Sequence, residues 1–366
     1  MTRPRVLLLA PGPESRGGMD TVVRTILDSP LRDQLDMQRL TTHRPGGPVA
    51  KLLAGLGGYL RLVGEIVTHR PDLVWIHATS GFSIRRKAAA AGLLRALSVP
   101  YIFHLHSAKV GRHLAHANKW ERAILGNVLR RAESVIVLDP SWEEWLAELD
   151  VTESIFIPNP VAVPNEIPDP ASRPQLVVQI GNVSRPKGAP ETAAGFLAIA
   201  DEFPQARLIL AGELLEPEVS AVIVGDPHRD QVELPGWVEP NAVADLLDEA
   251  AILVLASHVE GMPMVVLEAM THGATVVCTP VGALPSVIQD GHNGILVPVG
   301  DSAAIARALR TLLNHRDRAA QLAARARQTV QDAYSLQAVL PKYRAVIHGA
   351  IDRYRSSTRR RRRVRH

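Results

Sequence analysis

The sequence predicts two doubly wound α/β domains joined by a proline-rich segment. Short apolar runs alternate with helical patterns, the alternation stops at Ile157–Gln175, and it then restarts. Near-continuous apolar strands separated by helices are typical of a parallel sheet that is covered on both faces. At 366 residues the chain is long enough for about two domains, each with a core of its own.

Four apolar, branched runs in the first half are predicted to be buried strands. They are Val6–Ala10, Leu73–His77, Tyr101–His106 and Ser134–Leu138. Helices are expected between them at Gly18–Leu27, Leu52–Thr68, Arg85–Leu97 and Arg112–Arg131. Six prolines within Ile157–Gln175 then indicate an extended linker, because proline interrupts helices and restricts the residue before it.

The second half repeats the alternation. Strands are expected at Leu176–Ile180, Ala206–Ala211, Gln231–Leu234, Ile252–Leu255 and Thr275–Cys278. Helices are expected at Ala189–Asp201, Asn241–Glu249 and Met264–His272, and two or three more between Asp301 and Tyr354. We therefore place the first domain at residues 1–165 and the second at 166–337. Ligands of such sheets bind beyond the carboxyl ends of the strands, so two facing sheets would share a deep cleft.

The charge is unevenly distributed along the chain. Seven arginines lie within Arg355–His366, so the formal charge of +4 leaves the preceding 354 residues at −3. A mildly acidic body argues against a nucleic-acid-binding fold, and we expect no nucleic-acid partner. The single cysteine, Cys278, excludes an internal disulfide framework and fits a reducing compartment. No apolar run approaches the roughly 18 residues of a membrane span, and we expect a cytoplasmic protein.

Two glycine-bearing loops follow predicted strands. Gly17 and Gly18 stand at the start of a helix, where backbone N–H groups can approach an anion. In the second half, Gly181-Asn182-Val183-Ser184-Arg185-Pro186-Lys187-Gly188 follows the strand at Leu176–Ile180. Its two cations suit a diphosphate, Arg185 as a planar fork and Lys187 as a mobile point charge. A plain turn and a solvated loop are the structural alternatives.

Two carboxylates flank the start of one predicted helix. Glu260 lies in the loop after Ile252–Leu255, and Glu268 lies eight residues later in the helix. Pro263 falls in its first turn, where proline is tolerated. The pair could face one extended ligand with hydroxyls at two places. As a structural alternative, Glu260 would be a capping acid and Glu268 a solvated helical residue.

The stretch Glu260-Gly261-Met262-Pro263-Met264-Val265-Val266-Leu267-Glu268-Ala269-Met270 closely resembles the signature of the retaining glycosyltransferases of family four, which have the GT-B fold and use nucleotide-sugar donors. Six further segments match in order over residues 5 to about 350. They are Gly17-Gly18, Phe156–Pro160, Gly181–Gly188, Ala211–Glu213, Leu234–Val238 and Gly291–Val297. The resemblance implies two Rossmann-like domains that face each other across a cleft. It also implies that a last helix, at about 338–354, packs back on the first domain.

The resemblance assigns roles to named residues of the donor site. Glu268 would hydrogen-bond the ribose hydroxyls, and Glu260 would face the donor sugar. Arg185 and Lys187 would stabilise the charge that grows on the diphosphate as the glycosidic bond breaks. Three further parts of the chain complete the donor site. The segment of Met262, Pro263, Met264 and Val265 would offer its backbone N–H groups, which Pro263 itself lacks, at a helix N-terminus. The backbone near Trp237 and Val238 would meet the base, and Gly17 and Gly18 the pyrophosphate.

A strand-end histidine and the residue after Gly181 are two further positions of this family pattern. His104 and His106 share one face of the strand at Tyr101–His106, and the family register favours His106 as the histidine beside the sugar. Many relatives have arginine directly after the first glycine of the phosphate loop, whereas this chain has Asn182 there. Two alternatives follow: Arg185 replaces that charge, or Lys187 carries it alone.

We expect no metal and no cofactor. The sequence contains no D-x-D, the motif with which metal-dependent glycosyltransferases hold a divalent cation. His113 and His116 share a helical face but lack a nearby acid or cysteine, so a metal site there is not favoured. In the family, anomeric configuration is retained, and the leaving diphosphate is thought to assist deprotonation of the acceptor.

The leading hypothesis is therefore a retaining, metal-independent transferase acting in cell-envelope or exopolysaccharide synthesis. It would move a hexose-type sugar from a nucleoside diphosphate to a glycan or lipid-linked acceptor. One alternative is a nucleotide-sugar epimerase or hydrolase of the same fold. Another is a non-catalytic nucleotide-binding scaffold whose basic tail is the functional element. Basic segments at Ser80–Lys87 and Lys109–Trp120 could approach a phosphorylated or lipid-linked acceptor, with an ordinary solvated surface as the alternative.

The basic tail Arg355–His366 suggests a location. If the last helix returns to the first domain, these arginines emerge on the side that holds the acceptor. An anionic membrane attracts each arginine near its surface by about 1 kcal/mol. We therefore expect peripheral association with the inner face of the cell membrane through this tail, with a disordered, solubilising end as the alternative.

Overall fold

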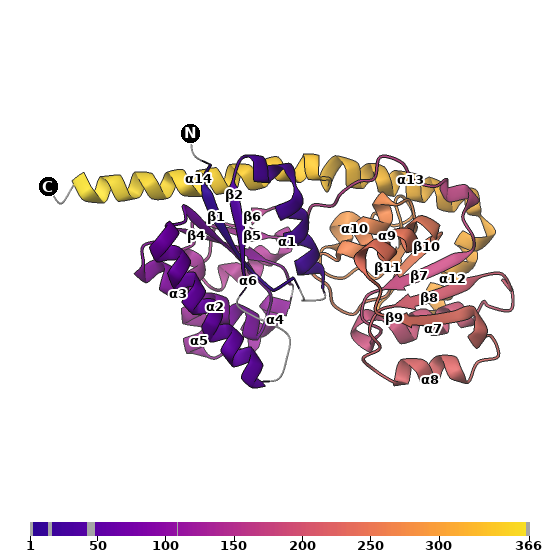
Figure 1. Ribbon diagram of the computed structural model, residues 1–366. Helices are drawn as coiled ribbons and strands as arrows, with labels where there is room; N and C mark the ends of the chain where they lie inside the picture. The colour runs from indigo at the N-terminus through magenta and orange to yellow at the C-terminus, as the bar shows by residue number, and fades with distance from the viewer. Residues whose placement is uncertain (1–2, 14–16, 42–47, 108, 364–366) are drawn as a thin grey trace. The chain divides into compact units, whose positions relative to one another are not determined.

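The computed structural model describes residues 3–13, 17–41, 48–107 and 109–363 (Figure 1). Contacts between Cα atoms divide the chain into two compact units. The first comprises Met1–Pro160 together with Leu336–His366, and the second comprises Val161–Ser335. The chain thus leaves the first unit at Pro160, builds the whole of the second, and rejoins the first at Leu336.

Six described strands form a parallel sheet in the first unit. They are β1 (Arg5–Ala10), β2 (Asp36–Thr41), β3 (Leu73–Ala78), β4 (Tyr101–Leu105), β5 (Ser134–Val137) and β6 (Ile155–Phe156). Their order is β2-β1-β3-β4-β5-β6, so the chain starts near one edge and moves to the other. Every residue of β3 and β4 is buried, as expected for central strands that are covered on both faces.

Six described helices of the first unit lie between these strands in the chain, and a seventh follows the second unit. They are α1 (Gly18–Asp28), α2 (Pro48–His69), α3 (Phe82–Ala96), α4 (Lys109–His116), α5 (Lys119–Arg130), α6 (Glu143–Ala147) and α14 (Leu336–Arg363). The predicted helix at Arg112–Arg131 is wrong as a single element, because the chain turns between α4 and α5. Asn118 begins α5 as its N-cap, and its side chain accepts from the backbone N–H of Glu121 at 2.9 Å. Asn followed by Glu three positions later is a sequence signal for this break.

Two strands at the sheet edges have no counterpart in the sequence prediction. Strand β2 buries only Leu40, and strand β6 has two residues, neither of them buried. An edge strand packs against one neighbour and faces solvent, so it needs no continuous apolar run. Patterns of hydrophobicity therefore identified the four central strands and missed the two at the edges.

Helix α14 crosses the sheet of the first unit from its carboxyl edge to its amino edge. Near its start, the Tyr343 hydroxyl donates to the carbonyl of Pro158 at 3.3 Å, just beyond β6. Near its end, Arg353 donates to the hydroxyl of Ser134 at the start of β5, and Arg355 pairs with Asp72 at 2.6 Å, just before β3. In Figure 1 the yellow helix then continues past the strands of this unit.

The last helix is longer than expected. We expected it to end near Tyr354, but α14 continues to Arg363, and residues 364–366 lie outside the described part of the chain. Within the first unit, α14 leaves from the amino edge of the sheet, which is opposite the edge where His106 follows β4.

The second unit has a parallel sheet of six described strands. They are β7 (Leu176–Ile180), β8 (Arg207–Ala211), β9 (Val232–Gly236), β10 (Ile252–Leu255), β11 (Thr275–Cys278) and β12 (Ile295–Leu296), in the order β12-β11-β10-β7-β8-β9. The helices are α7 (Ala189–Leu197), α8 (Glu218–Val224), α9 (Pro240–Glu249), α10 (Met264–Thr271), α11 (Leu284–Val287), α12 (Ser302–Asn314) and α13 (Arg316–Ala333). The short elements α8, α11 and β12 were not predicted.

Small residues let the layers of the second unit approach closely. Helix α7 packs on α12 at Gly195, where a Cβ atom would lie 2.8 Å from the carbonyl oxygen of Ser302. Around this contact Phe196, Ile305 and Leu309 are completely buried in one hydrophobic core that includes Val254 of β10. This core fixes β7 and β10 next to each other, and the loops after these two strands carry Lys187 and Glu260.

Membrane spans were also considered. Among the described residues, no helix combines the length and the apolar character that a bilayer crossing requires.

Candidate functional site

Both sheets are parallel, so in each unit all strands end at one edge and the loops that follow them meet there. In the second unit the loops after β7, β8, β10 and β11 pack backbone against backbone. A Cβ atom on Gly212 would lie 2.0 Å from the carbonyl oxygen of Gly181, and one on Gly282 would lie 2.4 Å from that of Glu260. These approaches leave no room for a side chain, so glycine at these positions holds the site compact.

The loop Gly181–Gly188 has the conformation that its glycines permit. Gly188 adopts φ +69°, and a Cβ atom there would lie 2.0 Å from the carbonyl oxygen of Ala256. The backbone N–H of His258 donates to the carbonyl of Pro186 at 3.0 Å. The phosphate-loop candidate is thereby fixed against the segment that leads from β10 to Glu260.

Lys187 and Glu260 meet in this arrangement. The Lys187 Nζ lies 2.6 Å from Glu260 Oε1, and the Ser257 hydroxyl donates to the same oxygen at 2.7 Å. The Glu260 side chain is 9% exposed and that of Lys187 is 32% exposed. The two residues that the sequence analysis assigned to the diphosphate and to the sugar thus form a half-buried, charge-assisted pair at the carboxyl edge.

Glu268 lies within helix α10, which begins at Met264. Burial raises the pKa of its carboxyl group to about 7. Pro263 precedes the helix as its N-cap residue, with φ −71° and ψ 121°, instead of occupying the first turn. Met262, Pro263 and Met264 are buried and Val265 is half-buried.

Arg185, Trp237 and Val238 lie on neighbouring loops of the same edge. Arg185 is exposed, and its backbone N–H donates to Glu216 Oε2 at 2.9 Å. Trp237 is 36% exposed, and its indole N–H donates to Glu239 Oε1 at 3.2 Å, whereas Val238 is half-buried. The structure gives Arg185 no side-chain contact with Lys187 or Glu260 among the interactions of the described residues.

In the first unit, Gly17 caps α1 and Gly18 is its first residue. The buried carboxylate of Asp20 follows in the first turn and binds two guanidinium groups, that of Arg24 at 2.6 Å and that of Arg39 at 2.5 Å. Arg39 also donates to the carbonyl of Pro11 at 2.6 Å. The sequence analysis missed this network, because Arg39 belongs to the unpredicted strand β2. Asp20 in the first turn of a predicted helix was the one sequence signal that could have pointed to this network.

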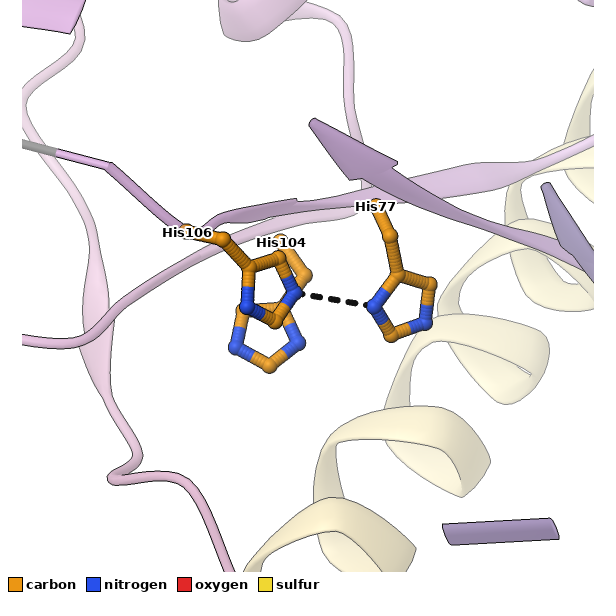
Figure 2. A group of neighbouring side chains, drawn as sticks. All are labelled: His77, His104 and His106. Atoms are coloured by element: carbon orange, nitrogen blue, oxygen red, sulfur yellow. Dashed lines mark hydrogen bonds between the residues drawn. The ribbon is translucent and has the colours of Figure 1, made fainter. Parts of the chain in front are cut away.

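Three histidines gather at the carboxyl edge of the first unit. Figure 2 shows His77 from β3 beside His104 and His106 from β4 and its end. The His77 Nδ1 lies 2.9 Å from His106 Nε2, and the ring centroids of His104 and His106 are 4.0 Å apart. Alternation along the strand correctly placed His104 and His106 on one face. His77 was missed, because only the pairing of β3 with β4 brings it opposite His104.

These histidines are neutral near pH 7. Burial lowers the pKa of His106 to about 3, and it lowers the pKa values of His77 and His104 well below the ordinary value. Lys87 is also buried, and its Nζ donates to the carbonyl of Leu9 at 2.7 Å. The edge therefore presents uncharged imidazole nitrogens, which can accept or donate a hydrogen bond without a change of net charge.

The three histidines could also act as ligands of a metal ion. One ligand atom from each histidine lies within 4.8 Å of the others, and neutral imidazoles bind zinc and similar ions. Burial is the main cause of the lowered pKa of His77, and the nearby Arg39 guanidinium adds to it; both would oppose a dication in the same way. No carboxylate or thiolate joins this cluster in the described part of the chain. The surroundings thus favour hydrogen bonding over metal binding.

Comparison with protein families decides the classification. The model of a glycosyl transferase 4-like domain matches residues 3–160, and the model of Glycosyl transferases group 1 matches residues 174–315. The chain belongs to the group 1 glycosyl transferases. The first match contains Gly17, Gly18 and His106. The second contains Lys187, Glu260 and Glu268.

Individual relatives of this glycosyl transferase agree with the family assignment. N-acetyl-alpha-D-glucosaminyl L-malate synthase of Bacillus anthracis is 28% identical over 180 residues, which are 48% of this chain and 46% of that protein. TuaC of Bacillus subtilis, named for teichuronic acid biosynthesis, is 26% identical over 257 residues, or 65% of this chain and 60% of that protein. The chain thus spans about half the length of the first relative and somewhat more of the second.

A solved structure shows the same fold. HepE of Anabaena in complex with UDP has a TM-score of 0.74 at 18% identity, and the match covers 95% of this chain and 100% of that chain. The fold is GT-B, with two Rossmann-like units, as the sequence predicted.

Proposed function

We propose that this group 1 glycosyl transferase moves a sugar from a nucleoside diphosphate to a glycan or lipid-linked acceptor with retention of anomeric configuration. The observation that carries the proposal is the pair of Lys187 and Glu260 at the carboxyl edge of the second sheet, 2.6 Å apart. A cation beside a carboxylate suits the two groups that the glycosidic bond joins. The cation can bind the diphosphate, which gains charge as the bond breaks, and the carboxylate can accept hydrogen bonds from the hydroxyls of the sugar.

Each side of the donor has a proposed partner in the second unit. Lys187 binds the diphosphate, with the exposed Arg185 as a second cation that replaces the arginine absent at Asn182. The backbone N–H groups at Met262–Val265 face the same phosphates, because the positive end of a helix dipole stabilises anions. Glu268 binds the ribose hydroxyls, and the backbone at Trp237 and Val238 meets the base.

Lys187 changes partner as the donor binds in this proposal. Its ion pair with Glu260 holds both side chains in place before binding. The diphosphate then attracts Lys187, and the released carboxylate accepts hydrogen bonds from the hydroxyls of the sugar. As the glycosidic bond breaks, charge grows on the leaving phosphate, and a fixed cation stabilises this transition state more than the ground state.

The first unit supplies neutral hydrogen-bonding groups. Gly17 and Gly18 offer backbone N–H groups at the start of α1, and the imidazole of His106 faces the sugar. We propose that the leaving diphosphate takes the proton of the acceptor hydroxyl and that no metal ion is needed. Supporting arguments are the absence of D-x-D from the sequence and the cationic residues around the histidine cluster.

We place the reaction in the synthesis of a cell-envelope or extracellular polysaccharide, at the inner face of the membrane. TuaC, which is similar over 65% of this chain, is named for teichuronic acid biosynthesis. A lipid-linked acceptor would require a peripheral membrane location, to which the arginines at the end of α14 would contribute.

The Lys187→Ala variant tests the proposal directly. We expect its kcat for sugar transfer to fall about 100-fold or more, the usual loss when a group that stabilises the developing charge is removed. Assays follow transfer from a panel of nucleoside diphosphate sugars in the presence of EDTA. Arg310→Ala is the matched control, because Arg310 forms an exposed ion pair with Glu202 in the same unit.

Three outcomes would contradict parts of the proposal. Full activity of Lys187→Ala would exclude the role of this lysine. Loss of wild-type transfer in EDTA would exclude metal independence. Rapid conversion of the donor without any acceptor would instead indicate the epimerase or hydrolase alternative.

A further inference from the structure

The first unit exposes three large apolar side chains on two neighbouring helices. Trp120 on α5 is 81% exposed, Phe82 on α3 is 76% exposed, and Ile124 on α5 is 56% exposed. The first two are the most exposed large hydrophobic side chains among the described residues. Aromatic residues make up only 4% of the sequence, so two of them in full contact with water require an explanation.

These side chains form one surface. The guanidinium of Arg85 lies 5.7 Å from the centroid of the Phe82 ring and donates to both carboxylate oxygens of Glu121, at 2.6 and 2.9 Å. Ile124 lies four residues after Trp120 and three residues after Glu121, so it neighbours both of them on the surface of α5. Figure 1 shows α3 and α5 close together in the first unit. We call Phe82, Arg85, Trp120 and Ile124 the α3–α5 surface.

The charge at this surface is positive. Its acid, Glu121, is neutralised by Arg85, whose hydrogen bond lowers the pKa of this carboxyl group, and Glu121 Oε1 also lies 2.7 Å from His113 Nε2. Lys119 and Lys109 are exposed at the starts of α5 and α4. Exposed aromatic and aliphatic side chains beside cations are the composition of surfaces that lie in the headgroup region of an anionic bilayer.

The surface also lies at the functional edge of the unit. Helix α3 follows β3 and α5 precedes β5, so both helices begin at the carboxyl ends of the strands. Phe82 and Trp120 are in the first turns of these helices. His77 and His106 occupy the same edge. The arginines of α14, by contrast, leave from the amino edge, where Arg355 pairs with Asp72.

We propose that the α3–α5 surface docks on an anionic lipid bilayer and presents the histidine edge to an acceptor held in that bilayer. This inference rests on the proposed lipid-linked acceptor and deepens it. The arginines of α14 add attraction from the opposite edge, but they cannot bring this edge to the lipid. Phe82, Trp120 and Ile124 enter the headgroup region, where an indole N–H still finds partners and the rings leave water.

The extent of the apolar area favours a membrane over a second protein. Fully buried aromatic side chains cover about 150–250 Å² each, so these three side chains offer less than the roughly 800 Å² that each partner contributes to a standard protein interface. Insertion into a headgroup layer needs no such area, because many weak contacts with lipid add to the attraction of the cations.

Flotation with lipid vesicles tests this proposal. The full-length chain is mixed with vesicles of phosphatidylcholine and phosphatidylglycerol and compared with the triple variant Phe82→Ser, Trp120→Ser, Ile124→Ser. We expect the partition coefficient of the triple variant to fall about tenfold or more, because three large apolar side chains no longer enter the lipid. Val224→Ser, at a 64% exposed valine of the second unit, is the control and should partition like the wild type.

Further arms make the result decisive. Stabilisation by added nucleoside diphosphate, measured as a shift in Tm, should be equal in all variants, which shows that the triple variant is folded. Deletion of Arg355–His366 should weaken binding less than the triple substitution does. Quenching of Trp fluorescence by brominated lipid should be strong in the wild type and weaker in Trp120→Phe.

The proposal is overturned if the triple variant binds vesicles as the wild type does, or if the tail deletion alone abolishes binding. It is also overturned if the wild type is a dimer that the triple variant dissociates while vesicle binding is unchanged, since a second copy would then cover the surface. Failure of the proposed function is a separate result, namely an absence of sugar transfer to any acceptor while vesicle binding follows the expected pattern.

Discussion

At the scale of single residues, the histidine cluster shows how burial sets chemistry. His104 is completely buried, and its two ring nitrogens have no hydrogen-bond partner among the described residues. His77 Nδ1 and His106 Nε2 instead share one hydrogen bond. Burial penalises a charge on each of the three rings, so all three stay neutral. The cluster can therefore orient His106 without adding charge at the carboxyl edge of the sheet.

This neutrality predicts a dependence of stability on pH. The folded-state pKa values of the three histidines lie below the ordinary value of about 6.5, so the unfolded chain binds more protons as pH falls below it. Their contribution to stability is present above about pH 6.5 and is lost toward lower pH. We expect His104→Leu to reduce the slope of unfolding free energy against pH by about 1.4 kcal/mol per pH unit between pH 5 and 6.

Urea unfolding of wild type and variant at several pH values measures this slope. The exposed His315→Gln is the control and should leave it unchanged. Glu268 acts in the opposite direction, because burial raises its pKa to about 7 and its contribution is lost as pH rises. Glu268 is present in both the wild type and His104→Leu, so its contribution to the slope cancels in the comparison. Parallel curves for wild type and His104→Leu would contradict the neutral cluster.

At the scale of elements, loop glycines hold the candidate site of the second unit together. Gly188 caps α7 with φ +69°, and a Cβ atom there would lie 2.0 Å from the backbone oxygen of Ala256. The neighbour is backbone and cannot rotate away. The turn and the packing of the loop after β7 against the loop after β10 both require glycine at this position.

We expect Gly188→Ala to destabilise the second unit by more than about 1–2 kcal/mol, the cost of the left-handed conformation alone for an L-residue. The clash adds to this and should also displace Lys187. Tm and nucleoside diphosphate affinity measure the two effects. Gly225→Ala is the control, because φ there is −84° and a Cβ atom would meet nothing within 4 Å. Equal Tm values for the two variants would contradict this account.

At the scale of the whole molecule, the last helix belongs to the first unit, although it directly follows the second unit in the chain. Helix α14 follows the second unit directly, yet its contacts lie on β3 and β4 of the first. Tyr343 is completely buried, and its ring lies 4.9 Å from that of Trp75 and 5.7 Å from that of His104. Folding of the first unit therefore needs both ends of the chain.

We expect Tyr343→Ala to destabilise the first unit by about 3–5 kcal/mol, as for other buried aromatic side chains. Hydrogen exchange should become faster in β3 and β4 and stay unchanged in β7 and β10. Lys342→Ala, at the exposed neighbouring position, should leave both unaffected. Equal acceleration in both units would show that α14 does not belong to the first unit alone.

Patterns in the sequence predicted the central strands and the glycine-bearing loop after β7. They did not predict features that depend on partners distant in the chain. Lys187, Glu260 and Glu268 could be proposed as site residues because they stand in a local pattern next to apolar runs. Strand β2 was missed because an edge strand needs little apolar surface, and with it Arg39 and its pair with Asp20 were missed. His77 carries no local signal at all.

By itself the sequence determined the class of fold, the central strands of the first sheet and the family, because each of these depends on short-range periodicity and on spacing within single loops. Only the tertiary structure decided that Lys187 contacts Glu260, that His77 binds His106, and that the arginines of α14 leave from the amino edge. These facts depend on which strands are neighbours and on the direction in which a helix crosses a sheet. Both are set by packing of the whole unit, which no local pattern encodes.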